Sequence, residues 1–501
     1  SDCFWLPDTF GYNMAIPQIM RESEVKYFYT TKIAWGDLND FPYNTFNWRG
    51  LDGSTVITHF NRIHCMPDAE TTQSMVNEIK EKQVFDGRLM SFGYGDGGGG
   101  PTWGMLEDAR RVQGLAGLPE QYYTTVSDFM KTVEREAVGL PVYSGELYVE
   151  THRGTLTQMH DIKRNNRKAE FALRDMEYFN VLSSTAKNSR TDEMYETLLI
   201  NQFHDILPGT CITPVNVKVR EQMTALIDAA KKEAAAYASG LTEGDGVTVF
   251  NTLSFARCGT VYLENLSGIP HGVLSQRFTD LCGRQMTAVS GLDIPAFGAV
   301  SLALDPDSAE KPGKSVFSYD GQVLDTPTLR VVFDENGFIA SMTEKSSGRE
   351  VRKAGGAPLN TFWFGEDIPR EWDNWNIDDD LARKLHPAGE LLSREVVTDG
   401  PIELRLRSVY RLTEKTTLKQ DMIFHADSPQ VDFHTVIDWN EKQKMLKVGF
   451  DVDIFSATVK NEIQFGHIER ATMPNNSFEA AKFEVCNHKW SDLAESRFGV
   501  A

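Results

Sequence analysis

Two short segments, almost two hundred residues apart, each place ionisable side chains among bulky apolar neighbours. Residues 5–12 read WLPDTFGY and contain Asp8, and residues 201–210 read NQFHDILPGT and contain His204 and Asp205. An uncompensated carboxylate or imidazole would be costly to bury in such surroundings. A bound metal ion or a sugar would compensate these groups, so both segments are candidates for a metal or carbohydrate site.

A third segment, residues 91–101, reads SFGYGDGGGGP and carries Asp96 as its only carboxyl group. Glycine-rich loops also bind phosphate, but no Gly-Lys-Ser/Thr follows this one and no helical pattern clearly opens from it. A carboxyl on a flexible loop above a sugar site suits a general acid/base. The alternative is a loop without a catalytic role.

These segments resemble, in order and spacing, the signature segments of glycoside hydrolase family 38, the zinc-dependent retaining α-mannosidases. Residues 145–155 (GELYVETHRGT) belong to the same series. Residues 372–378 (WDNWNID) and 462–470 (EIQFGHIER) extend the similarity into the C-terminal half, closest to the bacterial and cytosolic branch. The resemblance covers essentially the whole chain and rests on several long motifs.

The resemblance implies a retaining mechanism with two carboxylates. Asp8 matches the aspartate that is both the nucleophile and a zinc ligand, and metal contact would keep this carboxylate ionised and aimed. Asp96 would protonate the leaving oxygen and then activate water. One Zn²⁺ ion would bind two adjacent sugar hydroxyls and orient the substrate. It would not serve to produce a zinc-bound hydroxide.

Four further residues receive roles from the same resemblance. His204 matches the histidine that closes the zinc site, and Asp205 matches an aspartate that contacts sugar hydroxyls. Phe10 matches the aromatic residue that packs against the mannose ring, and Lys32 falls where a basic residue supports the nucleophile. The ordinary readings are an N-cap for Asp8, a core histidine, a core aromatic residue and a surface lysine.

Other residues of these motifs either line the cleft or serve the structure, and the sequence leaves both readings open: His152, Arg153, Trp372, Asp373 and Trp375. Three histidines receive no role: His59, His64 and His467.

The chain departs from the family pattern at its start. A His-x-Asp motif near the start of the catalytic domain supplies two zinc ligands in the family, and no such pair precedes Trp5. The sequence opens without Met and closes on an apolar run, FGVA, at residues 498–501. We therefore expect a fragment that lacks the zinc motif and the extreme C-terminus, with two zinc ligands upstream and little activity of its own.

Two alternatives belong to other classes of protein. One is a non-catalytic carbohydrate-binding or scaffold fragment, because half of the zinc ligands are missing. The other is a different zinc hydrolase, such as a deacetylase, which would use a metal-bound water and a single base. A retaining mannosidase instead predicts two carboxylates about 5–5.5 Å apart.

The amino-acid composition limits the classes of molecule that the protein is expected to bind. The formal charge of −20 argues against non-specific nucleic-acid binding, which needs Lys and Arg to neutralise phosphates. No apolar run approaches the roughly 20 residues that cross a bilayer, so no membrane partner is expected. Six scattered cysteines without CxxC spacing favour reduced thiols in the cytoplasm. The expected partner is a mannose-containing oligosaccharide or glycan, and a homo-oligomer is left open.

The patterning predicts a multidomain chain with an α/β, a helical and a β part. In residues 1–145 apolar runs at 25–29, 56–60 and 89–92 alternate with helical patterns at 72–81 and 105–113, as in a partial α/β catalytic domain with a parallel sheet. Active residues of such sheets follow the carboxyl ends of strands, and Asp96 follows the run at 89–92 in this way.

In residues 146–242 the apolar residues recur with the helical period. This spacing predicts a three-helix bundle with a polar joint at 188–190. His204 falls near the C-terminal end of the second predicted helix. The glycine-rich joint at 240–246 then begins a β-sandwich-type region over 243–501, truncated at its end. Its predicted strands lie at 247–250, 260–263, 329–333, 403–412, 416–424, 431–439 and 446–454, with a hairpin turn at 334–337.

Overall fold

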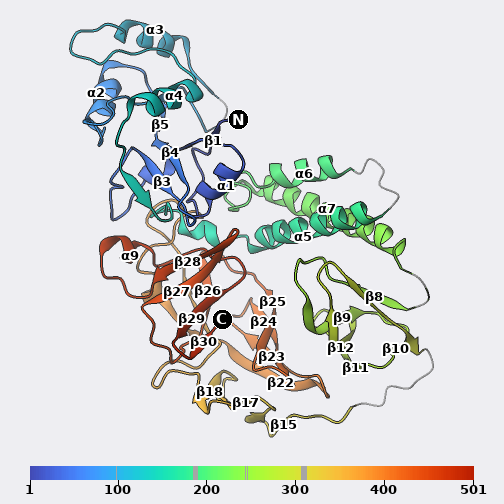
Figure 1. Cartoon of the computed structure of the whole chain (residues 1–501). Helices are drawn as coiled ribbons and strands as arrows, with labels where there is room; N and C mark the ends of the chain where they lie inside the picture. The colour runs from blue at the N-terminus through green and yellow to red at the C-terminus, as the bar shows by residue number, and fades with distance from the viewer. Residues whose placement is uncertain (97–98, 184–189, 243, 245, 306–312) are drawn as a thin grey trace.

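The computed structural model describes residues 1–96, 99–183, 190–242, 244, 246–305 and 313–501. Along the chain an α/β region is followed by long helices and then by a series of β-sheets (Figure 1). Parts of three sequence predictions lie outside the described residues: the glycines at 97–98, the polar joint at 188–189, and positions 243 and 245 of the glycine-rich joint.

A five-stranded sheet forms the centre of the N-terminal region, in the order β1-β2-β4-β3-β7. Its strands are β1 (Cys3–Trp5), β2 (Tyr27–Thr30), β3 (Thr45–Arg49), β4 (Thr55–Phe60) and β7 (Val142–Ser144). β1, β2 and β4 are parallel, but β3 is antiparallel to β4. The prediction of a parallel sheet is therefore wrong for β3, because residues 50–54 form a hairpin loop too short for a parallel crossover.

A separate two-stranded parallel sheet and four α-helices complete this region. They are β5 (Arg62–Cys65), β6 (Met90–Phe92), α1 (Ile16–Glu22), α2 (Ala69–Asn77), α3 (Trp103–Val112) and α4 (Val126–Glu136). Asp96 does follow a strand, but β6 pairs with β5 and not with the main sheet. A helix does open just after the glycine run, because the Thr102 side chain caps α3 by accepting a hydrogen bond from the Met105 amide.

The main sheet is held by aromatic packing on both faces. Every residue of β2 is buried, and Phe28, Phe46 and Trp48 are fully enclosed. On the other face Tyr29 packs in a second cluster with residues of α4. Strands buried on both sides are typical of the parallel part of α/β sheets, and they fix the positions of the loops that leave their carboxyl ends.

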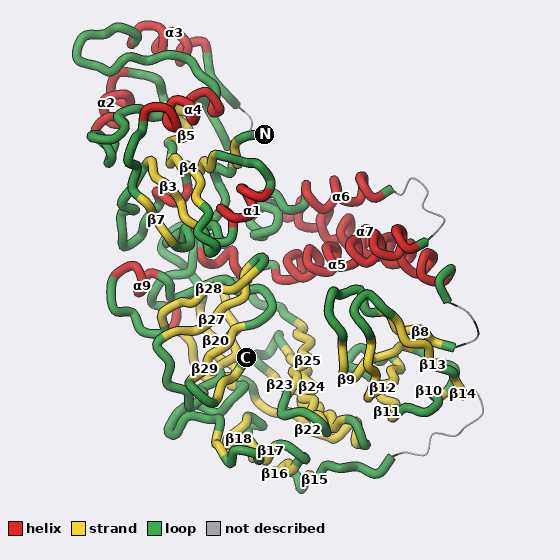
Figure 2. Tube along the Cα trace, in the orientation of Figure 1, coloured by secondary structure: helices red, strands yellow, loops and turns green. Residues whose placement is uncertain are grey.

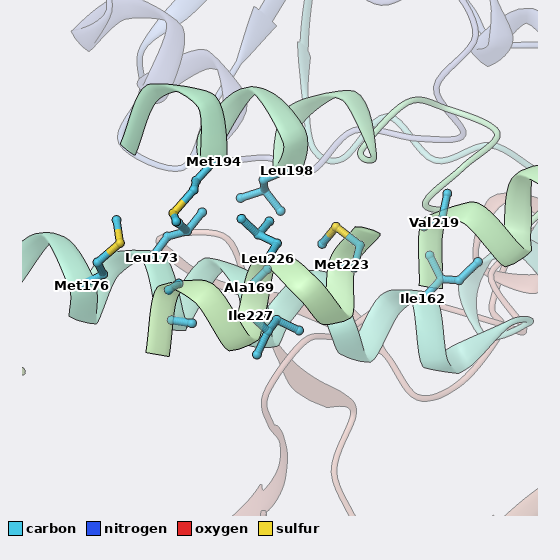
Figure 3. Packing of buried hydrophobic residues seen from close by; sticks show 12 residues of the cluster. Ile162, Ala169, Leu173, Met176, Met194, Leu198, Val219, Met223, Leu226 and Ile227 are labelled. Carbon is cyan, nitrogen blue, oxygen red and sulfur yellow. The ribbon is translucent and has the colours of Figure 1, made fainter. Parts of the chain in front are cut away.

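Three helices form the predicted bundle: α5 (His160–Leu182), α6 (Thr191–Ile200) and α7 (Thr213–Ser239). Figure 3 shows their shared core, where Leu173 and Met176 of α5 lie near Met194 of α6 and Leu226 of α7 lies between the helices. The helical period is confirmed, although Phe171, Leu182 and Leu199 of the same apolar pattern are exposed.

The rest of the chain is almost entirely β-structure, and Figure 2 shows it as yellow strands below the α/β region and the bundle. The first group contains the sheets β13-β8, β11-β12-β9 and β10-β14. Its strands are β8 (Val247–Phe250), β9 (Arg257–Glu264), β10 (Ile269–Pro270), β11 (Leu274–Thr279), β12 (Gln285–Ile294), β13 (Ala299–Leu302) and β14 (Leu304–Asp305).

The second group contains two larger sheets, β15-β16-β17-β18-β19 and β22-β23-β24-β25. Their strands are β15 (Ser318–Tyr319), β16 (Val323–Asp325), β17 (Leu329–Phe333), β18 (Ile339–Glu344), β19 (Arg349–Glu350), β22 (Glu390–Asp399), β23 (Glu403–Arg411), β24 (Thr417–His425) and β25 (Val431–Asp438). Val331 and Phe333 share one core with Leu406 and Phe424, so side chains of both sheets meet as in a sandwich.

The last group contains the sheets β21-β20-β26 and β28-β27-β29-β30 with two short helices. The elements are β20 (Thr361–Glu366), α8 (Leu381–Lys384), β21 (Leu385–Ala388), β26 (Lys444–Gly449), β27 (Thr458–Ile463), β28 (Gly466–Ala471), α9 (Ser477–Ala481), β29 (Ser491–Glu495) and β30 (Phe498–Val500). The strand predicted at 446–454 is confirmed only in part, since β26 ends at Gly449.

Buried polar contacts join this last group to the segment that leads into the bundle. Arg470 Nη2 of β28 lies 2.7 Å from Glu146 Oε2, and both side chains are buried. The Tyr148 hydroxyl donates a hydrogen bond of 2.6 Å to the Glu484 carbonyl. Residues 145–155 are thus held between the α/β region and the C-terminal sheets. No helix in the described part of the chain has the length and apolarity needed to cross a bilayer.

Candidate active site

Asp8 and Lys32 lie at the carboxyl ends of the neighbouring parallel strands β1 and β2. The Pro7 carbonyl accepts hydrogen bonds from the amides of Thr31 (3.0 Å) and Lys32 (3.2 Å), so the two loops are tied together. Asp8 caps no helix, because the next helix begins only at Ile16 with Ala15 as its N-cap. The N-cap reading of Asp8 is therefore wrong.

The Lys32 ammonium lies between a carboxylate and an aromatic ring. Its Nζ is 3.5 Å from Asp8 Oδ1 and 3.6 Å from the centroid of the Trp35 ring. The Lys32 side chain is only 12% exposed and that of Asp8 22%, so Lys32 is not a surface lysine. A cation held over an aromatic face beside a partly buried carboxylate supplies a fixed positive charge at that carboxylate.

Aromatic rings from three distant parts of the chain gather beside this pair. The His152 ring lies 5.1 Å from Phe10, 5.8 Å from Trp35 and 6.2 Å from Trp372, in edge-on arrangements. Trp35 and Trp372 are 6.1 Å apart. Phe10 is half-buried and Trp372 is exposed, so the cluster has one face open to solvent. An open aromatic face next to polar groups is the arrangement that sugar rings stack on.

His152 is fixed by a contact with the C-terminal half of the chain. It adopts a left-handed backbone conformation with φ of 58°, and its amide donates a 2.8 Å hydrogen bond to Asn376 Oδ1, which also lies 3.0 Å from its Nδ1. Gly154 donates from its amide to the Trp375 carbonyl at 2.8 Å, and a Cβ there would lie 3.0 Å from that oxygen. The close approach explains the glycine.

Burial lowers the pKa of His152, and the nearby Lys32 charge acts in the same direction. The hydrogen bond with Asn376 and the carboxylates of Asp205 and Asp8 act in the opposite direction. The charges that act on His152 thus include those of Asp8, Lys32 and Asp205. Residues of the α/β region and of the helical part, which are far apart in the sequence, thus act on the same side chain.

Glu150, two residues before His152, shapes the loop that carries Trp35. Its Oε2 accepts hydrogen bonds from the amides of Asp37 (3.1 Å), Leu38 (2.8 Å) and Asn39 (2.9 Å), and its Oε1 accepts one from the Asn39 side chain at 2.6 Å. Glu150 is buried. A carboxylate that gathers successive amides holds a loop firmly, because losing it would leave several donors unsatisfied.

His204 and Asp205 lie in the turns that follow α6, which ends at Ile200. The prediction that His204 sits on the helix is therefore wrong, because α6 ends before residues 201–210 begin. His204 Nε2 is 3.5 Å from Asp205 Oδ2, and the Phe203 ring lies 4.1 Å from the imidazole. Asp205 Oδ1 accepts a 2.6 Å hydrogen bond from the Thr210 hydroxyl, which fixes the carboxylate.

Asp96 stands apart from this group. Its side chain is 92% exposed, its backbone is left-handed with φ of 51°, and its Oδ1 lies 3.9 Å from His64 Nε2. His64 also accepts a hydrogen bond of 3.1 Å from the Gly95 amide through its Nδ1. Within the described residues, no hydrogen bond or ion pair joins Asp96 to Asp8 or to the aromatic cluster.

The residues proposed for zinc have suitable donors but are too few. Asp8 and His204 offer a carboxylate oxygen and an imidazole nitrogen, which zinc binds. Nowhere in the described ranges do three His, Cys, Asp or Glu side chains gather around one metal position. Catalytic zinc sites use about three protein ligands, so the described residues alone do not form one.

Three residues of the cluster received no role from the sequence: Trp35, Glu150 and Asn376. Each lies inside or beside a recognised motif. The available signal for Glu150 was an acidic residue between the apolar Val149 and Thr151, two positions before His152. The partners of Trp35 and Asn376 depend on contacts between distant segments, which one sequence does not reveal.

Three family models match successive parts of the chain. They are described as "Glycosyl hydrolases family 38 N-terminal domain" over residues 1–146, "Alpha mannosidase middle domain" over 150–241 and "Glycosyl hydrolases family 38 C-terminal domain" over 324–501. The chain belongs to glycoside hydrolase family 38. Membership in family 38 confirms the resemblance.

Sequence similarity to other proteins extends along the whole of this family 38 chain. Alpha-mannosidase 2C1 of Homo sapiens is 32% identical over 99% of the chain and 48% of its own length. Alpha-mannosidase of Saccharomyces cerevisiae is 29% identical over 100% of the chain and 46% of its own length. The chain therefore spans about half the length of these relatives. The crystal structure of an alpha-mannosidase from Enterococcus faecalis V583 shares the fold, with a TM-score of 0.76 at 14% identity, covering 100% of this chain and 68% of that one.

Proposed function

We propose that the protein carrying this chain is a retaining, zinc-dependent α-mannosidase that hydrolyses terminal α-mannosides of glycans or oligosaccharides. Membership in family 38 and the similarity to named α-mannosidases support the proposal. The observation that carries it is the position of Asp8, at the carboxyl end of β1, 3.5 Å from Lys32 and beside the aromatic cluster around His152. A partly exposed, oriented carboxylate next to an open aromatic face is what attack on a sugar requires.

In this proposal Asp8 attacks the anomeric carbon and forms a covalent glycosyl intermediate, with release of the leaving alcohol. Lys32 holds the carboxylate in position through its charge. Phe10 packs against an apolar face of the mannose ring, and Asp205, fixed by Thr210, accepts hydrogen bonds from sugar hydroxyls. Burial lowers the pKa of His152, which favours the neutral form of its ring in the site.

Asp96 is proposed as the general acid/base. It would protonate the leaving oxygen in the first step and take a proton from water in the second. Its exposed position next to His64, on the loop after β6, leaves it accessible to a substrate from outside. The proposal requires its carboxyl group to stand about 5–5.5 Å from that of Asp8 in the enzyme–substrate complex.

Zinc is proposed as the cofactor, with Asp8 and His204 among its ligands and the remaining ligands from outside the described residues. When bound, the ion would orient two sugar hydroxyls and stabilise developing charge. Since only two donors are offered here, we expect the 501-residue chain alone to bind zinc poorly and to have little activity. Calorimetric zinc titration of the chain alone, compared with the full-length protein, measures this directly.

We further propose a division into an α/β part at 1–145, a helical part at 146–242 and a β part from 243 onwards, supported by the change from helical to strand structure after α7. The substrate would be a neutral mannose-containing glycan. A cytoplasmic location is proposed because all six cysteines are free, as expected in a reducing compartment.

The direct test of the function is hydrolysis of para-nitrophenyl α-mannoside by the full-length protein, with Asp8→Asn as the variant. This change keeps side-chain volume but removes the nucleophile, and kcat should fall by about 10⁴-fold or more. An unchanged thermal unfolding profile would show that the fold remains. Appreciable turnover by the variant would contradict the assignment of Asp8 as the nucleophile. No turnover by the parent would contradict the proposed activity and favour a non-catalytic carbohydrate-binding role.

A further inference from the structure

A cavity lies in the C-terminal β region, close to the candidate site but distinct from it. Its volume is about 350 Å³, and its walls come from β20, the segment through α8, β26 and the residues after α9. The residues that bear on its chemistry are Trp363, Asp378, Asp379, Ala382, Phe483 and Glu484. This volume is at the lower end of the range for small-molecule sites, large enough for one or two sugar rings.

The lining combines aromatic rings with hydrogen-bond acceptors. Trp363 and Phe483 supply apolar surface. Asp378 is largely buried and oriented, since it accepts hydrogen bonds from the amide (2.9 Å) and Nε (3.3 Å) of Arg370. Asp379 is exposed, and within the described residues it has no ion-pair partner. Aromatic surface with a few oriented carboxylates suits a ligand with both an apolar face and many hydroxyl donors.

Charge excludes two other ligand classes. Lys447, the only basic residue in the lining, already forms an ion pair with Glu484, so no free cation is available for a phosphate or carboxylate ligand. The carboxylates do not gather around one metal position, since no such group of three occurs in the described part of the chain. The cavity therefore disfavours anionic ligands and metal ions, and its aromatic rings and acceptor oxygens suit a hydroxyl-rich ligand.

Residues that line the cavity lie next to residues that hold the candidate site in place. Phe483, which lines the cavity, lies under the Arg153 guanidinium at 4.1 Å, and Arg153 Nη2 donates a 2.8 Å hydrogen bond to the Ala481 carbonyl. Arg153 directly follows His152 of the aromatic cluster. On the other side, Asp378 follows Asn376, which holds His152, by two residues. Residues that line the cavity are therefore direct neighbours of the residues that hold His152.

We propose that this cavity is a distal subsite that binds a further sugar ring of the glycan substrate. The inference rests on the proposed function and adds to it a second sugar-binding position, through which extended mannose oligosaccharides are preferred to single mannosides. Ring stacking on Trp363 or Phe483 and hydrogen bonds to Asp379 would provide the added affinity. Occupancy would raise kcat/KM for extended glycans without altering the chemistry at Asp8.

The test compares two substrates in variants of the full-length protein. Ala382, exposed on α8, is changed to Phe to fill the cavity, and Asp379→Asn removes an acceptor charge. Matched controls are Arg383→Phe, on the same helix, and Glu371→Gln, exposed in the same segment; neither residue lines the cavity. We expect both test variants to lose about tenfold in kcat/KM for a high-mannose oligosaccharide, with para-nitrophenyl α-mannoside and both controls unchanged.

Calorimetry separates this inference from the function itself. In an Asp8→Asn background, the oligosaccharide should bind about tenfold more weakly to the filled-cavity variant, while methyl α-mannoside binds equally to both. If the parent cleaved no α-mannoside, the proposed function would fail and this binding comparison would still decide the subsite. The proposal is overturned if filling the cavity leaves both the substrate ratio and the oligosaccharide affinity unchanged.

Discussion

Lys32 Nζ lies 3.5 Å from Asp8 Oδ1, and the pair joins the ends of two neighbouring parallel strands. Both loops are anchored on the Pro7 carbonyl, so the distance is set by the sheet and not by flexible side chains alone. The Trp35 ring covers the ammonium from the other side. This relationship gives the candidate nucleophile a fixed direction, as preorganised sites require.

Removing the Lys32 charge should slow the reaction without unfolding the protein. Lys32→Met should lower kcat/KM by about 10–100-fold, the loss expected for one charge-assisted contact of about 1.5–3 kcal/mol. Lys32→Arg should retain more activity because the positive charge remains. Lys26→Met, at an exposed position, is the control. Steady-state kinetics check this, and equal activity of the Met and parent proteins would show that Lys32 does not act on Asp8.

The role of Asp96 is tested with substrates of different leaving groups. Asp96→Asn should lower kcat/KM for methyl α-mannoside by about 10²–10⁴-fold, since its poor leaving group needs protonation. The loss on para-nitrophenyl α-mannoside should be much smaller. Asp108→Asn, exposed on α3, is the matched control. Equal losses on both substrates would mean that another residue is the acid.

Glu150 should control the loop that carries Trp35. Glu150→Gln replaces one acceptor oxygen by a donor facing three amides, so the loop should be destabilised by about 1–3 kcal/mol. Hydrogen exchange at residues 37–39 should become faster, and kcat/KM should fall with it. Glu120→Gln, at an exposed position, should change neither quantity. Unaltered exchange in the Glu150 variant would show that the carboxylate does not hold the loop.

The buried His59 side chain should make the folded protein less stable in acid. It is fully buried in β4, and burial lowers its pKa from 6.5 to about 3. Between these values the unfolded chain binds a proton that the folded chain excludes, so stability rises with pH there. The protection of β4 amides should fall by about 2 kcal/mol from pH 7 to pH 5.

Hydrogen exchange of β4, corrected for the intrinsic rate at each pH, measures this change. The control is His59→Gln, which can still hydrogen-bond to the Thr45 hydroxyl but does not titrate. Its protection should fall less than that of the parent over the same range. Identical falls in both proteins would assign the acid sensitivity to other groups, such as His152, whose pKa is also lowered by burial.

Local patterns predicted the helical part and several strands but missed many others, among them β12 and β22. The strands at 247–250 and 329–333 and the three helices follow directly from periodicity and turn residues. The antiparallel β3 was missed because no strand was predicted at 45–49, and the short loop at 50–54 sets its direction relative to β4. The end of α6 was placed too late because apolar residues continue past it into the turns.

The site itself was predicted only in part. Asp8, Phe10 and Lys32 come close together because two adjacent strands end there, a relation that sequence order suggests. The contacts of His152 with Trp372 and Asn376 join residues more than two hundred positions apart. Such contacts arise from the packing of whole regions. The proximity of His204 to Asp8 stays a prediction, as does the separation of the Asp8 and Asp96 carboxyl groups.

The most direct test of the account is to trap the covalent intermediate. A fluorinated mannosyl donor with a good leaving group should react once with the full-length protein and hydrolyse slowly, because fluorine destabilises the second transition state. Peptide mass spectrometry should then find the fluoromannosyl group on Asp8 in residues 5–12. The Asp8→Asn protein should remain unlabelled. Labelling at another carboxylate, or rapid turnover without any labelled peptide, would contradict the assignment of Asp8 as the nucleophile.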